Sequence, residues 1–328
     1  MKAQFEINSR SLEARFKKRL ADERAALSQG TLVSLRGYLS TSKHVGNTLS
    51  LDKERNALHE ARTALPYRLC TITFADGYFG LRQAIDIDSA RYALDSGLAT
   101  GVIDHDTFRW LLIALCQAAN RIATTTGHFA QFLKVKSNNL RAYTAQRRRS
   151  FWENWVQCAS GLRPIGLRHW RRRNRAFNCE SLGLLSMLQV GSLRPSIVYA
   201  DPPYTDDQYS RYYHVWETLV KYDYPAANGE GRYRPDRFQT PFSRIDDVGW
   251  AFKELIRRSA ALDADLVLSY PKQGLLYHAG HDVVALLRRF YSRVALPAEM
   301  PHKHSTMGAS KGRATNSVTE QIYFASNA

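Results

Sequence analysis

Acidic residues and cysteines are both scarce in this sequence. Its 30 Asp and Glu residues stand against 46 Lys and Arg residues, which gives a formal net charge of +16. A surplus of this size attracts polyanions such as nucleic acid or an anionic membrane. The four cysteines (Cys70, Cys116, Cys158 and Cys179) lie far apart, without a Cys-x-x-Cys pair or a matching His spacing. We therefore predict reduced thiols, and neither a zinc site nor another metal site.

Long hydrophobic runs are missing as well. The first twenty residues contain several charges but no unbroken apolar stretch, which a secretory signal would need. The most apolar helical segment, residues 108–123, is interrupted by two arginines and two amides. It is too short and too polar to cross about 30 Å of hydrocarbon. We expect no membrane partner, no targeting segment and a location in the cytoplasm.

The positive charge is concentrated in one segment. Between Lys134 and Arg175, twelve Lys or Arg residues stand against one acid, Glu153. Arginine clusters at 147–149 and 171–173 flank Phe and Trp residues, a mixture typical of surfaces that neutralise phosphates and stack on bases. The alternatives are a solvated basic face and a flexible insertion. The residues that we predict to contact phosphates are Lys134, Arg147, Arg148, Arg149, Arg171, Arg172 and Arg173.

Periodicity predicts an α/β protein. Helical spacing occurs over residues 8–28, 87–96, 106–123, 208–222 and 281–290, with Asp106 or Thr107 expected to cap the third helix. Buried strands are predicted over 193–200, 262–270, 292–298 and 317–324. Strands that alternate with helices in the last 150 residues favour a sheet with ligand sites at the carboxyl ends of its strands.

One motif has the composition expected of a site that binds an amino group. Asp201 follows a predicted strand directly, and Pro202, Pro203 and Tyr204 come next. Prolines end the strand and leave their carbonyls free, so the Asp201 carboxylate and the Pro202 carbonyl can both accept hydrogens from one amine. Tyr204 offers a π-face to a planar base. Two acceptors favour the pyramidal form of an aromatic amine, the form that can attack an electrophile.

The motif and its surroundings resemble the adenine-specific DNA methyltransferases of the Dam-like class. The Asp-Pro-Pro-Tyr motif at 201–204 is followed by Asp-Gln-Tyr-Ser-Arg-Tyr-Tyr-His at 207–214, Glu-Thr-Leu at 217–219 and Tyr-Asp-Tyr-Pro at 222–225. Leu-Ser-Tyr at 268–270 is similar to the family's next strand, and residues 318–322 to its last. The likeness covers about residues 70 to 325.

The resemblance implies a reaction and a set of site residues. It implies S-adenosyl-L-methionine as methyl donor, double-stranded DNA as partner and a target adenine flipped out of the duplex. Asp201 and Pro202 would then hold the amino group next to the cofactor, Pro203 would stiffen the loop, and Tyr204 would stack on the base. Tyr209 and Tyr213, which follow at helical spacing, are candidates for the base pocket.

One family feature is missing. Members carry a Phe-x-Gly-x-Gly loop that approaches the cofactor, and this sequence contains no such motif. The nearest candidate is residues 73–80, with Asp86 or Asp88 after it, but its glycine spacing differs. The simpler expectation is that Met1 begins after the missing motif. The chain would then be truncated, split or degenerate, and a companion chain would supply the cofactor loop.

These inferences give one architecture and three functional hypotheses. We expect a Rossmann-like methyltransferase core at 1–75 and 176–328, with the motif in the second part, and a helical, basic DNA-recognition insert at 76–175. The first hypothesis is a site-specific DNA adenine N6-methyltransferase of a restriction-modification system. The second is a catalytically silent or split DNA-binding subunit that needs a companion. The third keeps the enzyme but changes its acceptor to cytosine N4 or an RNA adenine.

Overall fold

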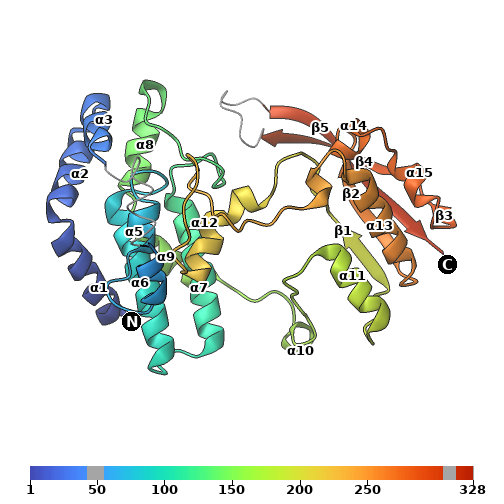
Figure 1. The fold of residues 1–328 in the computed structure, drawn as a ribbon, viewed down its shortest axis with the longest axis horizontal. Helices are drawn as coiled ribbons and strands as arrows, with labels where there is room; N and C mark the ends of the chain where they lie inside the picture. Colours follow the sequence, from blue (N-terminus) through green and yellow to red (C-terminus); the bar gives the residue numbers. More distant parts are fainter. Residues whose placement is uncertain (43–54, 306–314, 328) are drawn as a thin grey trace. The chain divides into compact units, whose positions relative to one another are not determined.

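The computed structural model describes residues 1–42, 55–305 and 315–327, and it divides the chain into two compact units. Unit 1 comprises Met1–Pro164 and Arg211–Arg237, and unit 2 comprises Ile165–Ser210 and Phe238–Ala328 (Figure 1). The helices of unit 1 include α1 (Lys2–Arg15), α2 (Lys17–Gln29), α3 (Leu32–Ser40), α5 (Leu69–Thr73), α6 (Leu81–Ala99), α7 (His105–Ile122), η2 (Ser137–Asn139), α8 (Leu140–Arg147) and α9 (Phe151–Gly161). Helix α12 (Ser210–Lys221) starts at the last residue of one unit 2 segment and continues into unit 1.

Unit 2 contains every strand that the structure assigns within the described residues. Its helices are α10 (Arg168–Arg171), α11 (Ser181–Val190), η3 (Pro241–Ser243), α13 (Val248–Ala260), α14 (Leu275–His278) and α15 (Val283–Leu287). Its strands are β1 (Ile197–Ala200), β2 (Asp265–Pro271), β3 (Arg293–Val294), β4 (Ala298–Ser305) and β5 (Thr315–Ser326). The expected α/β composition is confirmed, with the sheet confined to unit 2.

The helices of unit 1 start and end where local chemistry requires. The predicted helix over 8–28 is two helices, α1 and α2, because the backbone at Phe16 leaves the helical conformation (φ −108°, ψ 19°). Gly30 ends α2 at a positive φ of 63°, which glycine adopts without a Cβ penalty. The cap of α7 is Asp104, and not Asp106 or Thr107 as predicted. Its carboxylate accepts a hydrogen bond of 2.7 Å from the Thr107 N–H.

Buried carboxylates hold the centre of unit 1 together. Asp88, fully buried within α6, accepts hydrogen bonds from the N–H groups of Cys70 (2.7 Å) and Thr71 (2.8 Å) and from the hydroxyl of Tyr222 (2.7 Å). Glu23 of α2 accepts hydrogen bonds from two N–H groups in the first turn of α6. Helix α6 begins at Leu81, six residues before the predicted start. Its first turn is stabilised by the hydrogen bonds to Glu23 and by the burial of its apolar side chains.

The sheet of unit 2 has the order β1-β2-β5-β3, and β4 also pairs with β5. Strands β1 and β2 are parallel, with Tyr199 opposite Val267, whereas β5 runs antiparallel to β2, with Val267 opposite Phe324. The strands predicted over 193–200, 262–270 and 317–324 are therefore confirmed as β1, β2 and β5. The strand expected over 292–298 is reduced to the two residues of β3, and β4 begins at Ala298.

One face of this sheet carries the core of unit 2. Alternate residues of a strand point to opposite faces, so Leu266 and Leu268 of β2 lie on the same face of the sheet. Both are buried there, together with Tyr323 of β5. Helices α11, α13, α14 and α15 all contribute buried side chains to the same cluster, Phe252 and Ile256 of α13 among them. The core of unit 2 therefore lies on the face that bears Leu266 and Leu268.

Four further sequence predictions bear on the whole chain. All four cysteines are free, and Cys70 and Cys158 are buried. Among the described residues, no helix is long and apolar enough to cross a bilayer. The cytoplasmic location stays a prediction. The division at residues 75 and 175 also stays a prediction, because the two compact units are defined by packing and the predicted parts by function.

Candidate active site

The carboxyl end of β1 opens into a cavity of about 670 Å³ within unit 2. Three of the four residues of the Asp-Pro-Pro-Tyr motif line it, namely Asp201, Pro202 and Pro203, and Tyr209 does so as well. Its other walls come from the segment before α11, from β1, from α11 and α13, and from residues near η3: Phe177, Asn178, Cys179, Glu180, Ser181, Leu184, Leu185, Val198, Tyr199, Ala200, Phe238, Thr240, Phe242 and Leu255.

Strand β1 ends at Ala200 because two consecutive prolines follow Asp201 and cannot donate to a sheet ladder. No described residue donates a hydrogen bond to the Asp201 carboxylate or to the Pro202 carbonyl. Two acceptors of one short loop are therefore available to a ligand, as an amine-binding site requires.

One hydrogen bond from α14 holds the motif loop in place, and a second joins α14 to β2. The Leu275 N–H donates 2.9 Å to the carbonyl of Tyr204, and the Leu276 N–H donates 2.9 Å to the hydroxyl of Tyr270. Glycine at position 274 lets the Tyr270 ring pack closely against the backbone before α14, because a Cβ at this position would lie 2.3 Å from that ring. The loop is thus fixed between β1 and the turn that follows β2.

Tyr209 is positioned by its neighbours in sequence. The Gln208 side chain accepts from the Thr240 N–H (2.7 Å) and donates to its carbonyl (3.3 Å). The Ser210 hydroxyl donates 2.7 Å to the carbonyl of Phe238. Tyr209 is therefore held at the cavity wall from both sides.

A second carboxylate lies near the motif. Partial burial, and then the negative charge of Glu320 on β5, raise the pKa of Asp201. The same two causes, with the charge of Asp201 added, raise the pKa of Tyr204. The Ser269 hydroxyl donates a hydrogen bond of 3.2 Å to Glu320 and holds its carboxylate on the sheet. No sequence pattern pointed to Glu320, because its position depends on the register between β2 and β5.

Tyr213, the other candidate for the base pocket, does not line this cavity. It lies on the unit 1 part of α12, is 49% exposed and stacks on Trp216 with ring centroids 5.5 Å apart. That Tyr213 contributes to the base pocket therefore stays a prediction, because its side chain does not line the cavity beside Asp201.

The predicted phosphate contacts fall into two groups, and the first lies in unit 1. Lys134 is exposed and pairs with Glu230 at 2.9 Å. Arg147 is buried, and its guanidinium donates 2.6 Å to the Gly77 carbonyl. Arg148 donates to the Leu27 carbonyl, and Arg149 donates 2.9 Å to that of Arg121. Arg147 thus packs inside unit 1, where it is too buried to contact a phosphate.

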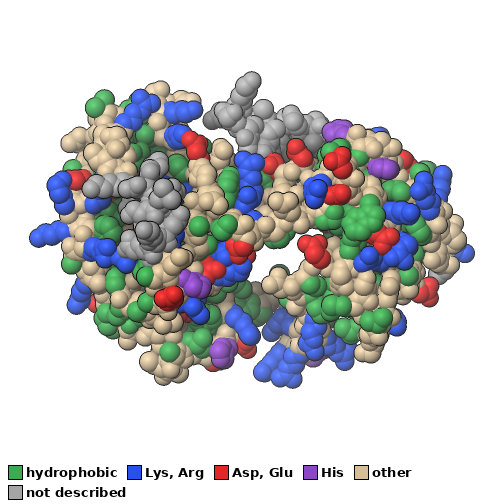
Figure 2. Space-filling view, in the orientation of Figure 1, with side chains coloured by type: hydrophobic (Ala, Val, Ile, Leu, Met, Phe, Trp, Pro, Cys, Tyr) green, Lys and Arg blue, Asp and Glu red, His purple; other side chains and the backbone are tan. Residues whose placement is uncertain are grey.

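The second group belongs to unit 2. Arg171 ends the short helix α10 and donates to the carbonyl of Gly166, while Arg172 and Arg173 follow it and are exposed. Figure 2 shows the Lys and Arg side chains gathered over α10. This cluster is the more accessible of the two.

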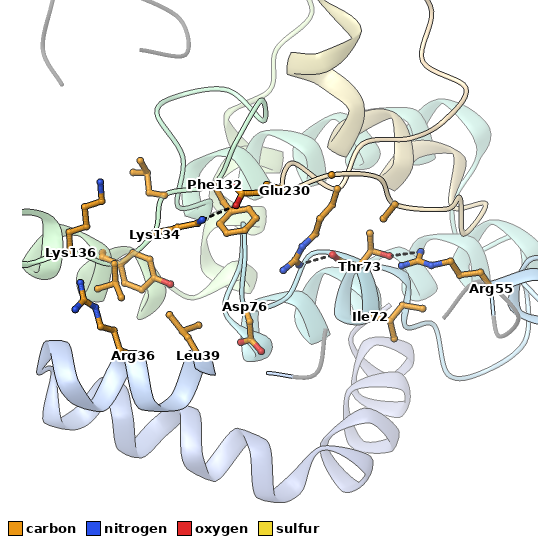
Figure 3. Close-up of a pocket in the computed structure, with 16 residues that line it drawn as sticks. Arg36, Leu39, Arg55, Ile72, Thr73, Asp76, Phe132, Lys134, Lys136 and Glu230 are labelled. Atoms are coloured by element: carbon orange, nitrogen blue, oxygen red, sulfur yellow. Dashed lines mark hydrogen bonds and ion pairs between the residues drawn. The ribbon is translucent and has the colours of Figure 1, made fainter. Parts of the chain in front are cut away.

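The loop considered for the cofactor, residues 73–80, has a structural role in unit 1. A Cβ at Gly77 would lie 2.9 Å from the Arg232 guanidinium, and one at Gly80 would lie 2.7 Å from Glu23. Both glycines therefore allow close packing within the protein. Thr73 instead faces a separate cavity of about 610 Å³ (Figure 3). There its hydroxyl accepts 3.1 Å from Arg55 and its carbonyl accepts 2.7 Å from Arg232.

Comparisons with known proteins bear directly on the motif. Residues 185–262, which include β1 and the Asp-Pro-Pro-Tyr motif, match the D12 class N6 adenine-specific DNA methyltransferase family. The predicted resemblance is thereby confirmed. No solved structure matches the chain significantly.

Curated relatives agree with this family. The chain is 26% identical over 256 residues to modification methylase LlaI of Lactococcus lactis subsp. lactis. The aligned region covers 76% of this chain and 37% of that methylase. The chain is 27% identical over 200 residues to the type II methyltransferase M.FokI of Planomicrobium okeanokoites, 61% of this chain and 27% of that enzyme. For M.NlaIII of Neisseria lactamica the identity is 26% over 250 residues, 73% and 66% of the two chains. The chain thus spans about a third of the length of the first two relatives.

Proposed function

We propose that this protein is a site-specific DNA adenine N6-methyltransferase. The observation that carries the proposal is the position of Asp201, Pro202 and Pro203 at the carboxyl end of β1, where they line a cavity and leave two acceptors unoccupied. The family match includes this strand and motif. Relatives named as modification methylases and type II methyltransferases favour a role in a restriction-modification system.

The two acceptors act on the amino group of the target base. Asp201 and the Pro202 carbonyl each accept one N–H of the adenine amine, which shifts the nitrogen toward the pyramidal form and localises its lone pair. Tyr204 stacks on the base and holds the ring across the site. Pro202 and Pro203 keep the acceptors in place through their fixed φ. The residues stabilise the attacking form of the amine without a covalent enzyme intermediate.

The donor in this proposal is S-adenosyl-L-methionine, which supplies an electrophilic methyl group when bound. The described residues do not complete a site for it. The glycines of residues 73–80 are packed against Arg232 and Glu23, and β2 is the sole described neighbour of β1. Asp201 and Pro202 would contact the donor from the base side.

Double-stranded DNA is the proposed substrate, with the basic segment between Lys134 and Arg175 as its reader. Arg172 and Arg173 are exposed and Arg171 half-buried, in a cluster of cations that suits phosphate contacts. Lys134, Arg148 and Arg149 of unit 1 are the other proposed contacts. In this proposal the sheet of unit 2 is the catalytic part of a Rossmann-like core, and residues 76–175 are the recognition insert.

Transfer of a tritiated methyl group from S-adenosyl-L-methionine to duplex DNA tests the proposal. Asp201→Ala removes one of the two acceptors, and we expect a loss of about 100-fold or more. Asp206→Ala, at an exposed carboxylate five residues on, is the matched control and should keep the rate. Equal incorporation by the wild type and Asp201→Ala would overturn the proposal, as would methyl groups found on cytosine.

The second candidate is a DNA-binding subunit that becomes an enzyme with a companion. The incomplete donor site favours it. Calorimetric titration of the chain alone with S-adenosyl-L-methionine separates the two, since tight binding would exclude the need for a companion.

A further inference from the structure

The cavity of about 610 Å³ that Thr73 faces lies wholly within unit 1, and we call it the unit 1 cavity (Figure 3). Its walls come from α3, from α5 and the residues after it, from residues 132–136, from α8 and from the loop over 227–232. Cavities of about 300–1,000 Å³ are the size that takes small ligands. No residue of the Asp201 site lines this cavity, so any ligand of it is additional to the target base.

Positive charge dominates the lining of the unit 1 cavity. Five cations stand against two acids, namely Arg36, Arg55, Lys134, Lys136 and Arg232 against Asp76 and Glu230. Both acids are already paired, Asp76 with Arg19 at 3.0 Å and Glu230 with Lys134 at 2.9 Å. The charge that remains unbalanced is positive and suits an anionic ligand.

Two of the cations are free to reach such a ligand. Arg36 of α3 and Lys136 are exposed, and neither forms an ion pair with a described residue. Figure 3 shows both at one end of the cavity, on the same side as Lys134. An anion at this end would contact them without breaking an existing ion pair.

Arg232 is a buried cation without a counter-ion. It is 8% exposed, and its Nη1 donates 2.7 Å to the carbonyls of both Thr73 and Ala75. Its Nη2 has no hydrogen-bond partner among the described residues. Burial lowers the pKa of Arg232 to about 10, so the guanidinium is still charged at neutral pH. Because buried charges are normally paired, an anion in the cavity would supply the counter-charge that is missing.

The backbone holds this cation in a fixed and unfavourable conformation. Arg232 has a φ of 54° and Asp76 a φ of 59°, two of the five non-glycine residues with positive φ in the described part of the chain. Asn228 and Tyr233 close the loop with two backbone hydrogen bonds, of 2.9 and 2.8 Å. Strain of this kind is concentrated at ligand clamps and active sites. A cation fixed in advance also lowers the cost of binding.

The rest of the lining is aromatic and aliphatic. The Phe132 ring lies between the end with Arg36 and the end with Arg55 (Figure 3), and the Arg232 guanidinium is 5.2 Å from its centroid. The buried ring of Tyr143 lines the cavity as well. Aromatic rings next to cations favour a ligand that joins a planar ring to an anionic group. A nucleotide has both parts.

We propose that the unit 1 cavity binds a single nucleotide, with its phosphate at Arg36 and Lys136 and its base against Phe132. A nucleotide of a DNA strand and a free nucleotide share this chemistry. An inorganic anion would leave the aromatic wall uncovered, and a neutral base would leave the cations without a counter-charge. The inference goes beyond the proposed function, and it rests on that function only where the nucleotide belongs to the substrate DNA.

Calorimetric titration of the full chain with thymidine 5′-monophosphate tests the inference. Thymine lacks the amino group that Asp201 and Pro202 would hold, so this probe is not directed to the catalytic cavity. We expect one site per chain. Thymidine without its phosphate should bind at least about tenfold more weakly. Inorganic phosphate should do so as well, because it lacks the base that stacks.

Variants of the cavity locate the site. Arg36→Gln combined with Lys136→Gln should weaken binding of the monophosphate about tenfold. Arg15→Gln combined with Arg24→Gln makes the same change of charge at two exposed positions of unit 1 outside the cavity, and should bind like wild type. Phe132→Leu keeps the wall apolar but removes the ring, and should weaken binding about fivefold or more.

Duplex DNA as a competitor identifies the source of the nucleotide. Displacement of the monophosphate, with weaker DNA binding by the cavity double variant alone, would assign a nucleotide of the DNA strand. Retention of the monophosphate at saturating DNA would assign a free nucleotide. Three results would each overturn the inference: no binding at about 1 mM, equal binding by the two double variants, and equal affinity for inorganic phosphate.

These measurements are independent of the proposed function. Asp201→Ala should bind the monophosphate like wild type and yet transfer no methyl group. Nucleotide binding without any methyl transfer by the wild type would leave the inference standing and remove the proposed function. Methyl transfer without nucleotide binding in the unit 1 cavity would do the reverse.

Discussion

The N–H of Leu275 donates a hydrogen bond of 2.9 Å to the carbonyl oxygen of Tyr204. This bond joins the last residue of the motif loop to the first residue of α14, in the turn that follows β2. The loop that holds Asp201 is thus attached to both strands of the parallel pair.

Leu275→Pro removes the donor and should leave α14 intact. The first helical position tolerates proline, and Gly274 before it is already extended (φ −72°, ψ 162°). We expect methyl transfer to fall about fivefold, since one hydrogen bond contributes about 1 kcal/mol. Leu275→Val shortens the side chain but keeps the N–H. Equal rates for the two variants would contradict a positioning role for this bond.

Glu320 should set the acid limit of the reaction. Because burial and Glu320 raise the pKa of Asp201, its carboxylate takes up a proton at a higher pH than an ordinary aspartate. Protonation removes an acceptor, so the rate should fall as the pH drops through this raised pKa. Glu320→Gln keeps the hydrogen bond from Ser269 and should move the acid limb to lower pH. A pH profile of kcat identical to that of the wild type would exclude this coupling.

The arginines after α10 should determine the salt dependence of DNA binding. Replacing Arg171, Arg172 and Arg173 by alanine should weaken binding to all sequences alike. The slope of log K against log salt should decrease by about 0.9 for each phosphate that the variant no longer neutralises. Arg288 and Arg289, exposed on the same unit, provide a control double variant of the same kind. Fluorescence anisotropy at several salt concentrations measures both, and equal slopes for the two variants would refute the assignment.

Asp88 should be required for the stability of unit 1. Asn at this position turns one acceptor oxygen into an amide that faces buried donors, so Asp88→Asn should lower the free energy of unfolding by about 1–3 kcal/mol. Asp106→Asn, at an exposed carboxylate of α7, should change it by less than about 0.5 kcal/mol. Urea unfolding followed by circular dichroism compares them. A similar midpoint for both variants would show that the three hydrogen bonds of Asp88 contribute little.

The sequence predicted the elements that depend on local chemistry. Two prolines after a β-branched run located the end of β1 at Asp201, and Gly30 located the end of α2. It did not predict where α6 begins, because the first turn of that helix is stabilised by Glu23, nearly sixty residues earlier in the chain. Long-range contacts of this kind leave no periodic signal.

The candidate site divides in the same way. Asp201, Pro202 and Tyr209 follow one another closely and could be assigned from their spacing. Glu320 could not be assigned, because its place beside Asp201 depends on how β5 pairs with β2. Arg147 belongs to a run of three arginines that look alike in sequence, and tertiary packing alone distinguishes the buried one from its neighbours.

The backbone passes between the two units three times, after Pro164, Ser210 and Arg237. Unit 1 is complete once Arg237 has left the ribosome. At that moment β1 has emerged, but β2, its neighbour in the sheet, has not. During synthesis the helical unit can therefore fold first, while the strand that precedes the Asp-Pro-Pro-Tyr motif still lacks its partner. A nascent chain arrested when Arg237 has just emerged from the ribosome should contain a folded unit 1 and an unpaired β1.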